Sequence, residues 1–252
     1  MPTKFEEQYL DMILVPSGLL VMFIYHLYLA YRVLRYPATT VIGYDTHNWK
    51  AWVQKMMEGD LDYVSIALTV ININVEAVIF VAFMNISILA FLGVFVGTSG
   101  SYSVNSVYIV GSKSSIVLSL KSVLIIFALV VSFGAFILST RYYVQANSLI
   151  SMPKADVSVK FVQSALVGGN YLWEVGVRVL YLSVVFMFWS FGPIPMFGAS
   201  VVTVICLYFM DSNSFPLHQY KQVSKRPVKN VVEEVDDTVL GAVKHRGGKV
   251  AE

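Results

Sequence analysis

Apolar and polar stretches alternate along the chain in a pattern that predicts membrane-crossing helices. The apolar segments are Met12–Leu34, Tyr63–Val96, Ile116–Leu138, Leu172–Phe191 and Met196–Met210. A helix needs roughly 20 apolar residues to cross about 30 Å of hydrocarbon, and the first and third segments meet this requirement directly. The pattern therefore predicts an all-α protein, a polytopic transmembrane helical bundle.

The last two segments decide the number of spans. Gly192-Pro-Ile-Pro195 separates them, and two prolines cannot be accommodated in a continuous helix. We therefore expect a tight turn here and a return through Met196–Met210. That stretch has fifteen residues, fewer than the roughly 17 needed for a full crossing. Five spans are favoured, and four spans with a re-entrant segment are the alternative.

Lys and Arg are distributed very unevenly between the two predicted sides. With five spans, one side carries Arg32, Arg35, Lys50, Lys55, Arg141, Lys154, Lys160, Lys221, Lys225, Arg226 and Lys229, and the other carries only Lys4 and Lys113. Cytoplasmic flanks are normally the ones rich in Lys and Arg. The asymmetry favours five spans with the N-terminus outside and the C-terminus in the cytoplasm.

The polar stretches delimit the domains. We expect a short N-terminal tail over residues 1–11, a transmembrane helical domain over 12–215 and a flexible C-terminal tail over 216–252. The second apolar segment has 34 residues, about 50 Å of helix. Part of that helix should therefore project from the membrane or tilt strongly.

The loop after the first span predicts an amphipathic helix near 46–58. Trp49 and Trp52 recur on its apolar face, and Lys50 and Lys55 lie on other faces. Such a helix can lie in the interface against anionic lipid, or it can pack on the base of the protein itself. In the tail, Lys221, Lys225 and Arg226 would add attraction to anionic lipids of the cytoplasmic leaflet.

Composition supports the membrane assignment. Hydrophobic residues make up 56% of the chain and charged residues 13%, whereas a soluble domain has about a quarter charged residues. With 252 residues and five spans there is no room for a large soluble domain. The net charge of +2 gives no support for a nucleic-acid partner.

Ionisable groups inside a bilayer are costly, so they commonly face the protein interior or water. The predicted spans contain such groups in the half nearer the basic side, together with one amide: His26, Asn72, Glu76, Glu174 and Arg178. We hypothesise that Glu76, Arg178 and His26 converge in one buried polar cluster. The alternative is a simple ion pair of Glu174 with Arg178, one helical turn apart, that locks helices together.

Small residues at helical spacing predict close helix packing. Gly93 and Gly97 form a GxxxG step at the far end of the second segment, and Ala128, Ser132 and Ala135 share one face of the third. Small side chains let helix backbones approach closely in lipid.

Catalytic motifs are missing from the sequence. It contains no GxSxG, Walker, HExxH or CxxC pattern, and His47 and His218 have no neighbours at metal-ligand spacing. We expect no enzymatic activity, no cofactor and no metal site.

Several short fragments resemble one known family. Leu14-Val-Pro-Ser-Gly-Leu19, Tyr25-His26, Thr40-Val-Ile-Gly43, Ala51-Trp-Val53, Arg141-Tyr-Tyr143 and Phe191-Gly-Pro-Ile-Pro-Met-Phe197 occur in this order. Together they resemble the plant and bacterial membrane family catalogued as domain of unknown function 599, over about residues 9 to 220, and plant members are the closer likeness. The resemblance implies an integral membrane protein, and it brings neither an activity nor catalytic residues.

Two functions remain open at this point. The first is a non-catalytic subunit, scaffold or pore-lining, that self-associates through its small-residue faces into a homo-oligomer. The second is a transporter or channel for protons or small ions that uses a polar cluster around Glu76 and Arg178. In either case we expect the lipid bilayer as the main partner and the plasma membrane as the location.

Overall fold

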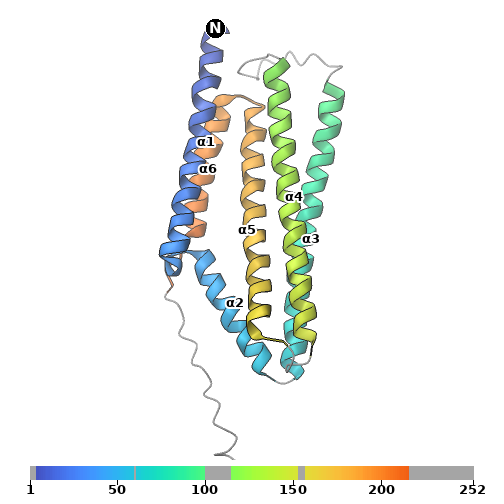
Figure 1. Cartoon of the computed structure of the whole chain (residues 1–252). Coiled ribbons are helices and arrows are strands. Elements are labelled where there is room, and N and C mark those ends of the chain that lie inside the picture. The colour runs from blue at the N-terminus through green and yellow to red at the C-terminus, as the bar shows by residue number, and fades with distance from the viewer. Residues whose placement is uncertain (1–3, 60, 100–114, 153–156, 216–252) are drawn as a thin grey trace, which may run out of the picture. The chain divides into compact units, whose positions relative to one another are not determined.

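The computed structural model describes residues 4–59, 61–99, 115–152 and 157–215, which form six α-helices and one short 3-10 helix (Figure 1). In chain order these are α1 Lys4–Arg35, η1 Pro37–Thr39, α2 Val41–Glu58, α3 Leu61–Ser99, α4 Ser115–Ser151, α5 Val159–Trp189 and α6 Pro193–Asp211. Within the described residues, every helix except α2 and η1 is long and apolar enough to cross a membrane. The prediction of an all-α bundle with five such segments is confirmed.

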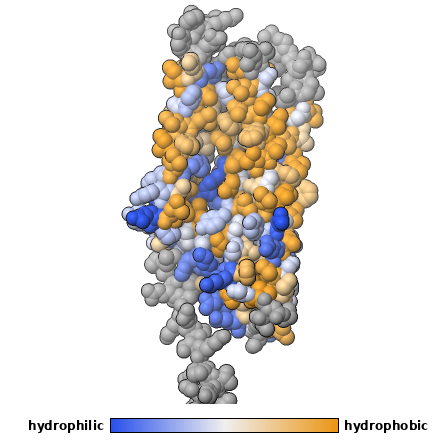
Figure 2. Space-filling model, viewed as in Figure 1, coloured by the Kyte–Doolittle hydropathy of each residue, from blue (hydrophilic) through white to orange (hydrophobic). Residues whose placement is uncertain are grey.

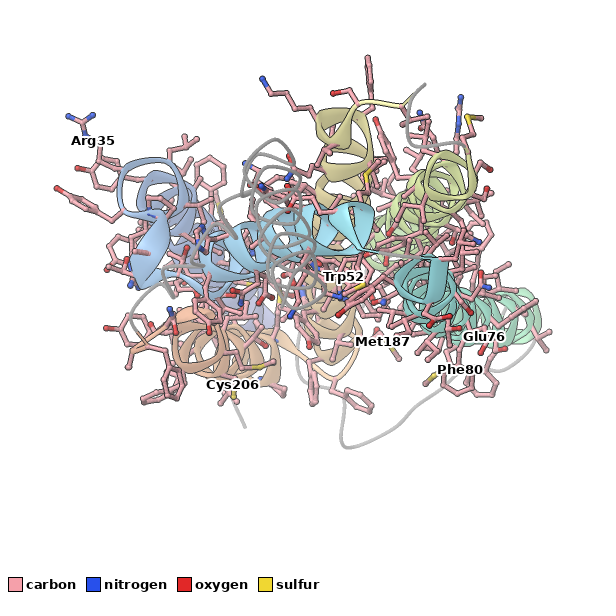
Figure 3. All side chains as sticks on the ribbon, turned by 90° about the horizontal axis from the view of Figure 1, so that it is seen from below. Arg35, Trp52, Glu76, Phe80, Met187 and Cys206 are labelled. Atoms are coloured by element: carbon pink, nitrogen blue, oxygen red, sulfur yellow. The ribbon has the colours of Figure 1, made fainter. Side chains whose placement is uncertain are left out.

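The long helices lie side by side in a fixed order. α3 packs on α4 and α4 on α5, while α6 packs on both α5 and α1. Figure 3, which views the bundle from below, shows α2 crossing beneath it, from the α1 and α6 side toward the base of α3 and α4. We call this the α2 end of the bundle, and the turn between α5 and α6 marks the Gly192 end.

The turn between α5 and α6 is as tight as the sequence predicted, but α6 begins earlier than expected. Gly192 has a φ of 142°, a conformation that favours glycine. Pro193 and Pro195 then occupy the first turn of α6, where proline is tolerated because its missing N–H has no helical partner. The helix therefore starts at Pro193 instead of Met196, and its 19 residues are long enough to cross.

α4 and α5 approach each other through small residues in matched positions. Ser132 Oγ donates to the Gly176 carbonyl at 2.8 Å, and Ser139 Oγ donates to the Gly169 carbonyl at 2.7 Å. Both serines are fully buried. The two contacts are seven residues, or two helical turns, apart on each antiparallel helix.

The rest of this small-residue face is also buried: Ala128 and Ala135 keep 3% and 7% of their surface exposed. Ala128 belongs to the apolar core cluster that α4 shares with α1, α5 and α6. The face that the sequence marked for packing therefore lies inside the protomer.

The helices differ in length so much that one end of the bundle extends past α6. With 19 residues α6 is about 28 Å long, and α3 with 39 residues is about 58 Å. A chain of hydrogen bonds shows which residues lie at the same height along the bundle. Asn85 Nδ2 of α3 donates to Ser132 Oγ of α4 at 2.9 Å, and Ser132 donates to the Gly176 carbonyl of α5. Arg178, two residues after Gly176, contacts the end of α6. Leu61 lies 24 residues before Asn85, about 36 Å along the axis.

This extension, which we call the projecting end, comprises residues 61–75, 142–152 and 157–167 together with α2. It has its own apolar core, in which Val53 and Met56 of α2 pack with Ile71, Tyr143 and Leu166. Part of α3 therefore extends beyond α6, as the length of the second apolar segment predicted.

The apolar face of α2 is used by the protein itself. Trp49 and Trp52 are half-buried, pack edge to face at 5.3 Å and lie against the core of the projecting end. Lys50 and Lys55 are exposed. Of the two alternatives for this helix, the structure places its tryptophans against protein, because the projecting helices offer an apolar surface at the same level.

Some sequence predictions lie outside the described part of the chain. These are the surroundings of Gly97, the residues Lys221, Lys225 and Arg226, the tail proposed over 216–252, and residues 1–3 of the tail proposed over 1–11. The described helix α1 already begins at Lys4, before the apolar segment starts.

Candidate functional site

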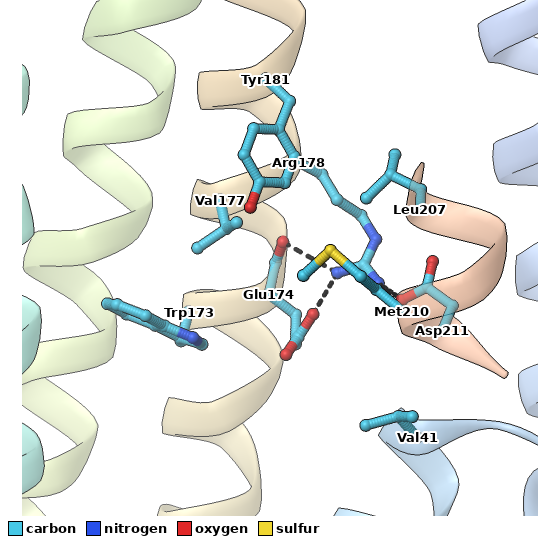
Figure 4. A pocket seen from close by; sticks show the side chains of 9 residues that line it. All are labelled: Val41, Trp173, Glu174, Val177, Arg178, Tyr181, Leu207, Met210 and Asp211. Atoms are coloured by element: carbon cyan, nitrogen blue, oxygen red, sulfur yellow. Dashed lines mark hydrogen bonds and ion pairs between the residues drawn. The ribbon is translucent and has the colours of Figure 1, made fainter. Parts of the chain in front are cut away.

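The most strongly charged site in the described bundle surrounds Arg178, on the face of α5 that meets α6. Arg178 is bound by two carboxylates: Glu174, one turn away on α5, and Asp211 at the end of α6, whose Oδ1 accepts from Nη2 at 2.6 Å (Figure 4). Its Nη1 also donates to the Glu174 carbonyl at 3.1 Å. The Arg178 side chain is 12% exposed and that of Asp211 9%, so this is a largely buried ionic group.

Asp211 connects the group to α1. The Tyr25 hydroxyl donates to Asp211 Oδ2 at 2.6 Å, so both carboxylate oxygens of Asp211 have a partner. Tyr25 itself is 7% exposed. We call Tyr25, Glu174, Arg178 and Asp211 the Arg178 cluster, and it joins α1, α5 and α6.

The chain just beyond α1 holds the end of α6 in place. Arg32 Nη2 donates to the Thr39 carbonyl at 2.7 Å, and its Nη1 donates to Ser212 Oγ at 3.3 Å. Asn213 N donates to the same Thr39 carbonyl at 3.1 Å. These contacts fix the two residues that follow Asp211, so the carboxylate is presented to Arg178 by a constrained helix end.

α2 begins beside this site at a well-formed N-cap. Thr40 Oγ1 accepts from Gly43 N at 3.2 Å and donates to the Pro37 carbonyl at 3.0 Å, and Thr40 is fully buried. A side chain at Gly43 would meet that Pro37 carbonyl at 2.2 Å. The tight turn through η1 therefore requires glycine at this position, and it directs α2 underneath α5.

A cavity of about 270 Å³ adjoins the Arg178 cluster (Figure 4). The charged residues Glu174, Arg178 and Asp211 line it, and so does a set of apolar and aromatic side chains from α2, α5 and α6: Val41, Trp173, Val177, Tyr181, Leu207 and Met210. A mixture of a few convergent polar groups with apolar walls is typical of ligand sites.

A further carboxylate, that of Asp45 on α2, belongs to the electrostatics of this site. Burial, and after it the negative charge of Glu174, raise the pKa of Asp45 above its ordinary value near 3.8. Asp45 lies outside the membrane-spanning helices. Its ionised form is therefore disfavoured by folding.

This shift predicts a pH-dependent effect of Asp45→Asn. A carboxyl group whose pKa is higher in the folded state destabilises the fold only where it is ionised, which is above its ordinary pKa. The variant should therefore melt higher than the wild type at neutral pH, and the difference should shrink as the pH falls toward 3.8. Thermal melts of the detergent-solubilised protein across this range test it. The exposed Asp62→Asn is the control, and a pH-independent gain in Asp45→Asn would contradict the electrostatic cause.

The predicted convergence of Glu76 and His26 with Arg178 does not occur among the described residues. Glu76 is exposed on α3, and Figure 3 shows it at the α3 edge of the bundle with Phe80, whereas Cys206 marks α6 at the other side. Glu76 also lies nine residues from Asn85, about 14 Å along the axis toward the α2 end. The Glu76 side chain therefore faces outward.

Asn72 and His26 have other partners. Asn72 Oδ1 accepts from Asn147 Nδ2 at 2.9 Å, which ties α3 to α4 in the projecting end. His26 Nδ1 lies 2.7 Å from the Met22 carbonyl, and its ring packs edge-on against Tyr25 at 5.6 Å. Of the five predicted site residues, only Glu174 and Arg178 come together.

Gly93 is exposed, and a Cβ there would meet no atom within 4 Å. It therefore makes no close helix contact with the described part of its own protomer.

Sequence reasoning missed Asp211, Tyr25 and Asp45. For Asp211 a signal was available: folding the chain back at Gly192 places residue 211 opposite residue 173, since both lie 19 residues from the turn. Residue 211 therefore lies one turn or less from Glu174 along the bundle, within reach of the long side chain of Arg178. Tyr25 and Asp45 approach through contacts between distant segments, which the sequence pattern does not encode.

A second polar group lies toward the Gly192 end. Lys121 of α4 is 4% exposed, and its ammonium lies 5.2 Å from the ring centre of Trp189. Trp189 Nε1 donates to Asp11 Oδ1 at 3.3 Å. The lysine is thus buried beside an aromatic face, a favourable environment for a desolvated cation.

The comparisons with known proteins give one match. A family model described as "Protein of unknown function, DUF599" matches residues 13–215, a range that includes the whole Arg178 cluster and its cavity. No curated protein and no solved structure matches the chain.

Proposed function

The chain belongs to this family of unknown function, and we propose that it is a non-catalytic membrane subunit that associates with copies of itself through the exposed face of α3. The family brings no activity, so the proposal rests on the residues of this chain. The observation that carries it is an exposed apolar face of α3 that extends past the end of α6.

α3 has few contacts with the rest of its protomer. Only 17% of its most apolar stretch is buried, compared with 39% for α4. Ile66, Ile73 and Phe80 recur every seven residues on one exposed face and are 52%, 58% and 66% exposed. A seven-residue apolar repeat is the pattern that packs against another helix.

Lipid can cover Phe80 but not the whole face. Ile66 and Ile73 lie in the projecting end, which extends past the level of α6, whose length matches one bilayer. Apolar side chains exposed to water in a row are typical of protein contacts. A second copy that presents the same face would bury both rows.

The orientation follows from the charge distribution. We place the N-terminus outside and the projecting end in the cytoplasm, because eleven of the thirteen Lys and Arg residues counted on the two sides fall on that side. The exposed Lys50 and Lys55 of α2 would then face the anionic leaflet, with the plasma membrane as the expected location.

The alternative, a transporter or channel with a polar cluster of Glu76 and Arg178, loses its basis in that pairing. The two side chains belong to opposite parts of the bundle, and α4 packs between their helices.

Particle mass tests the proposal. Native mass spectrometry of the wild-type protein in a mild detergent or a nanodisc should give a protein mass of two or more chains of 28.1 kDa each. Ile66→Lys combined with Ile73→Lys should shift it to the single-chain mass, because lysines facing each other across a symmetric contact repel and desolvate.

Phe161→Lys is the matched control, since Phe161 is an equally exposed apolar residue of the projecting end on α5 (67% exposed). It should keep the wild-type mass. A single-chain mass for the wild type, or an unchanged mass for the double variant, would contradict self-association through this face.

A further inference from the structure

The cavity beside Arg178 lies on the flank of the bundle. In Figure 2, hydrophilic atoms lie between the positions that α6 and α5 occupy in Figure 1, and mostly hydrophobic atoms lie above them. The lining residues Glu174, Arg178 and Asp211 account for the polar part, and Leu207 and Met210 of α6 belong to the apolar wall. A molecule whose head lies near the surface of a bilayer leaflet would meet this cavity from the side.

The charges around the cavity do not balance. Glu174 and Asp211 both bind Arg178, and Asp45 is close enough to Glu174 for its charge to act there. The guanidinium group of Arg32 binds Thr39 and Ser212 and is not among the residues that line the cavity. The cavity is thus lined by two carboxylates and one guanidinium group, and a partly buried excess negative charge is costly unless a cation accompanies it.

The walls of the cavity suit an organic cation better than a metal ion. Trp173 and Tyr181 both line it (Figure 4), and the faces of aromatic rings attract ammonium groups. Among the described residues, no group of three or more His, Cys, Asp or Glu side chains is arranged to hold a metal ion.

The size of the cavity limits the ligand. Its 270 Å³ corresponds to about nine waters at roughly 30 Å³ each, and it lies below the roughly 300–1,000 Å³ of sites for drug-sized ligands. It therefore accommodates a small polar head, while an attached chain would have to lie outside along the apolar flank.

From these observations we propose that the cavity binds the ammonium head of a membrane-resident amphiphile, with the head beside Glu174 and Asp211 and against the rings of Trp173 and Tyr181. The cation balances the carboxylates, and the apolar chain stays in the bilayer. The site is independent of the α3 face, so its test does not depend on self-association.

Dodecyltrimethylammonium is a suitable probe, added at submicellar concentration to the full-length chain in dodecyl maltoside, which has the same alkyl chain on a neutral head. We expect saturable binding by isothermal titration calorimetry. Glu174→Gln should weaken it at least tenfold, because the amide keeps a hydrogen-bond acceptor for Arg178 but removes the negative charge. Tyr181→Leu, which keeps every charge, should weaken it severalfold.

Glu58→Gln, a charge change at an exposed position of α2, is the control and should bind like the wild type. Binding that does not saturate, or that is the same in Glu174→Gln and Tyr181→Leu as in the wild type, would overturn the proposal. Tetramethylammonium that binds as tightly as the dodecyl probe would overturn the membrane-resident source, because the chain would then contribute nothing.

Discussion

Replacing Arg178 with methionine is expected to destabilise the protein by about 3 kcal/mol. Removing one member of a buried ion pair leaves its partner charged and unpaired, at a typical cost of 3–5 kcal/mol. Here two carboxylates lose their partner, but the Glu174 side chain is 26% exposed and water reduces its share. We therefore expect a value near the lower end.

Thermal melting in detergent measures this effect, and Arg35→Met is the matched control. Arg35 is exposed at the end of α1 and points away from the bundle in Figure 3, so its replacement should leave the melting temperature nearly unchanged. If Arg178→Met melts like Arg35→Met, the Arg178 cluster does not hold α5, α6 and α1 together.

A second substitution separates charge from packing. Adding Asp211→Asn to Arg178→Met removes one of the stranded carboxylates while the Tyr25 hydroxyl keeps an oxygen to bind. The double variant should recover part of the lost stability, since residues in one ionic network are not additive. No recovery would indicate that the loss comes from the missing arginine side-chain contacts.

The elements of the fold could be predicted from the sequence because length and turn chemistry determine them. The apolar segments gave the five long helices, and Gly192-Pro-Ile-Pro195 gave the turn, since glycine supplies the positive φ and proline can follow it only in the first helical turn. The early start of α6 was missed because proline was considered as a helix breaker and not as a first-turn residue.

Which face of a helix points inward could not be predicted in the same way. In water a polar face points outward, but lipid accepts apolar side chains as readily as a protein core does. Asn72 and Glu76 were therefore placed in the interior, and they lie on the exposed side of α3. The projecting end adds a second difficulty, because part of α3 extends past the end of α6 although its composition is that of a span.

Two fragments of the family resemblance acquire a physical role in the structure. Gly43 of Thr40-Val-Ile-Gly43 lies against Pro37, and the tyrosines of Arg141-Tyr-Tyr143 pack where Gly168 and Gly169 leave room. The sequence showed the small-residue face of α4 that includes Ser132, but the matching glycines of α5 become meaningful only when the two helices are placed in antiparallel register.

Gly176 is the position where this register can be tested with the largest effect. A Cβ there would lie 2.7 Å from Cε1 of Phe136, whose side chain is fully buried and packs against the Trp173 ring at 5.5 Å. The Gly176 carbonyl also accepts from Ser132. Neither helix can move away without losing that contact.

Gly176→Ala should therefore destabilise the protein by about 1–3 kcal/mol, the usual cost of overpacking a filled core. Gly134→Ala is the matched control in α4, because a Cβ at Gly134 meets nothing within 4 Å. In an open helix position alanine is favoured over glycine by up to about 1 kcal/mol. The two substitutions, chemically identical, should shift the melting temperature in opposite directions.

A compensating change identifies the cause. Phe136→Leu removes the ring atoms nearest to the new methyl group, so Gly176→Ala should cost less in a Phe136→Leu background than in the wild type, a coupling that a double-mutant cycle of thermal melts measures. If the two substitutions are additive, or if Gly176→Ala and Gly134→Ala shift the melting temperature alike, the close approach of α4 and α5 at Gly176 is not what holds these helices together.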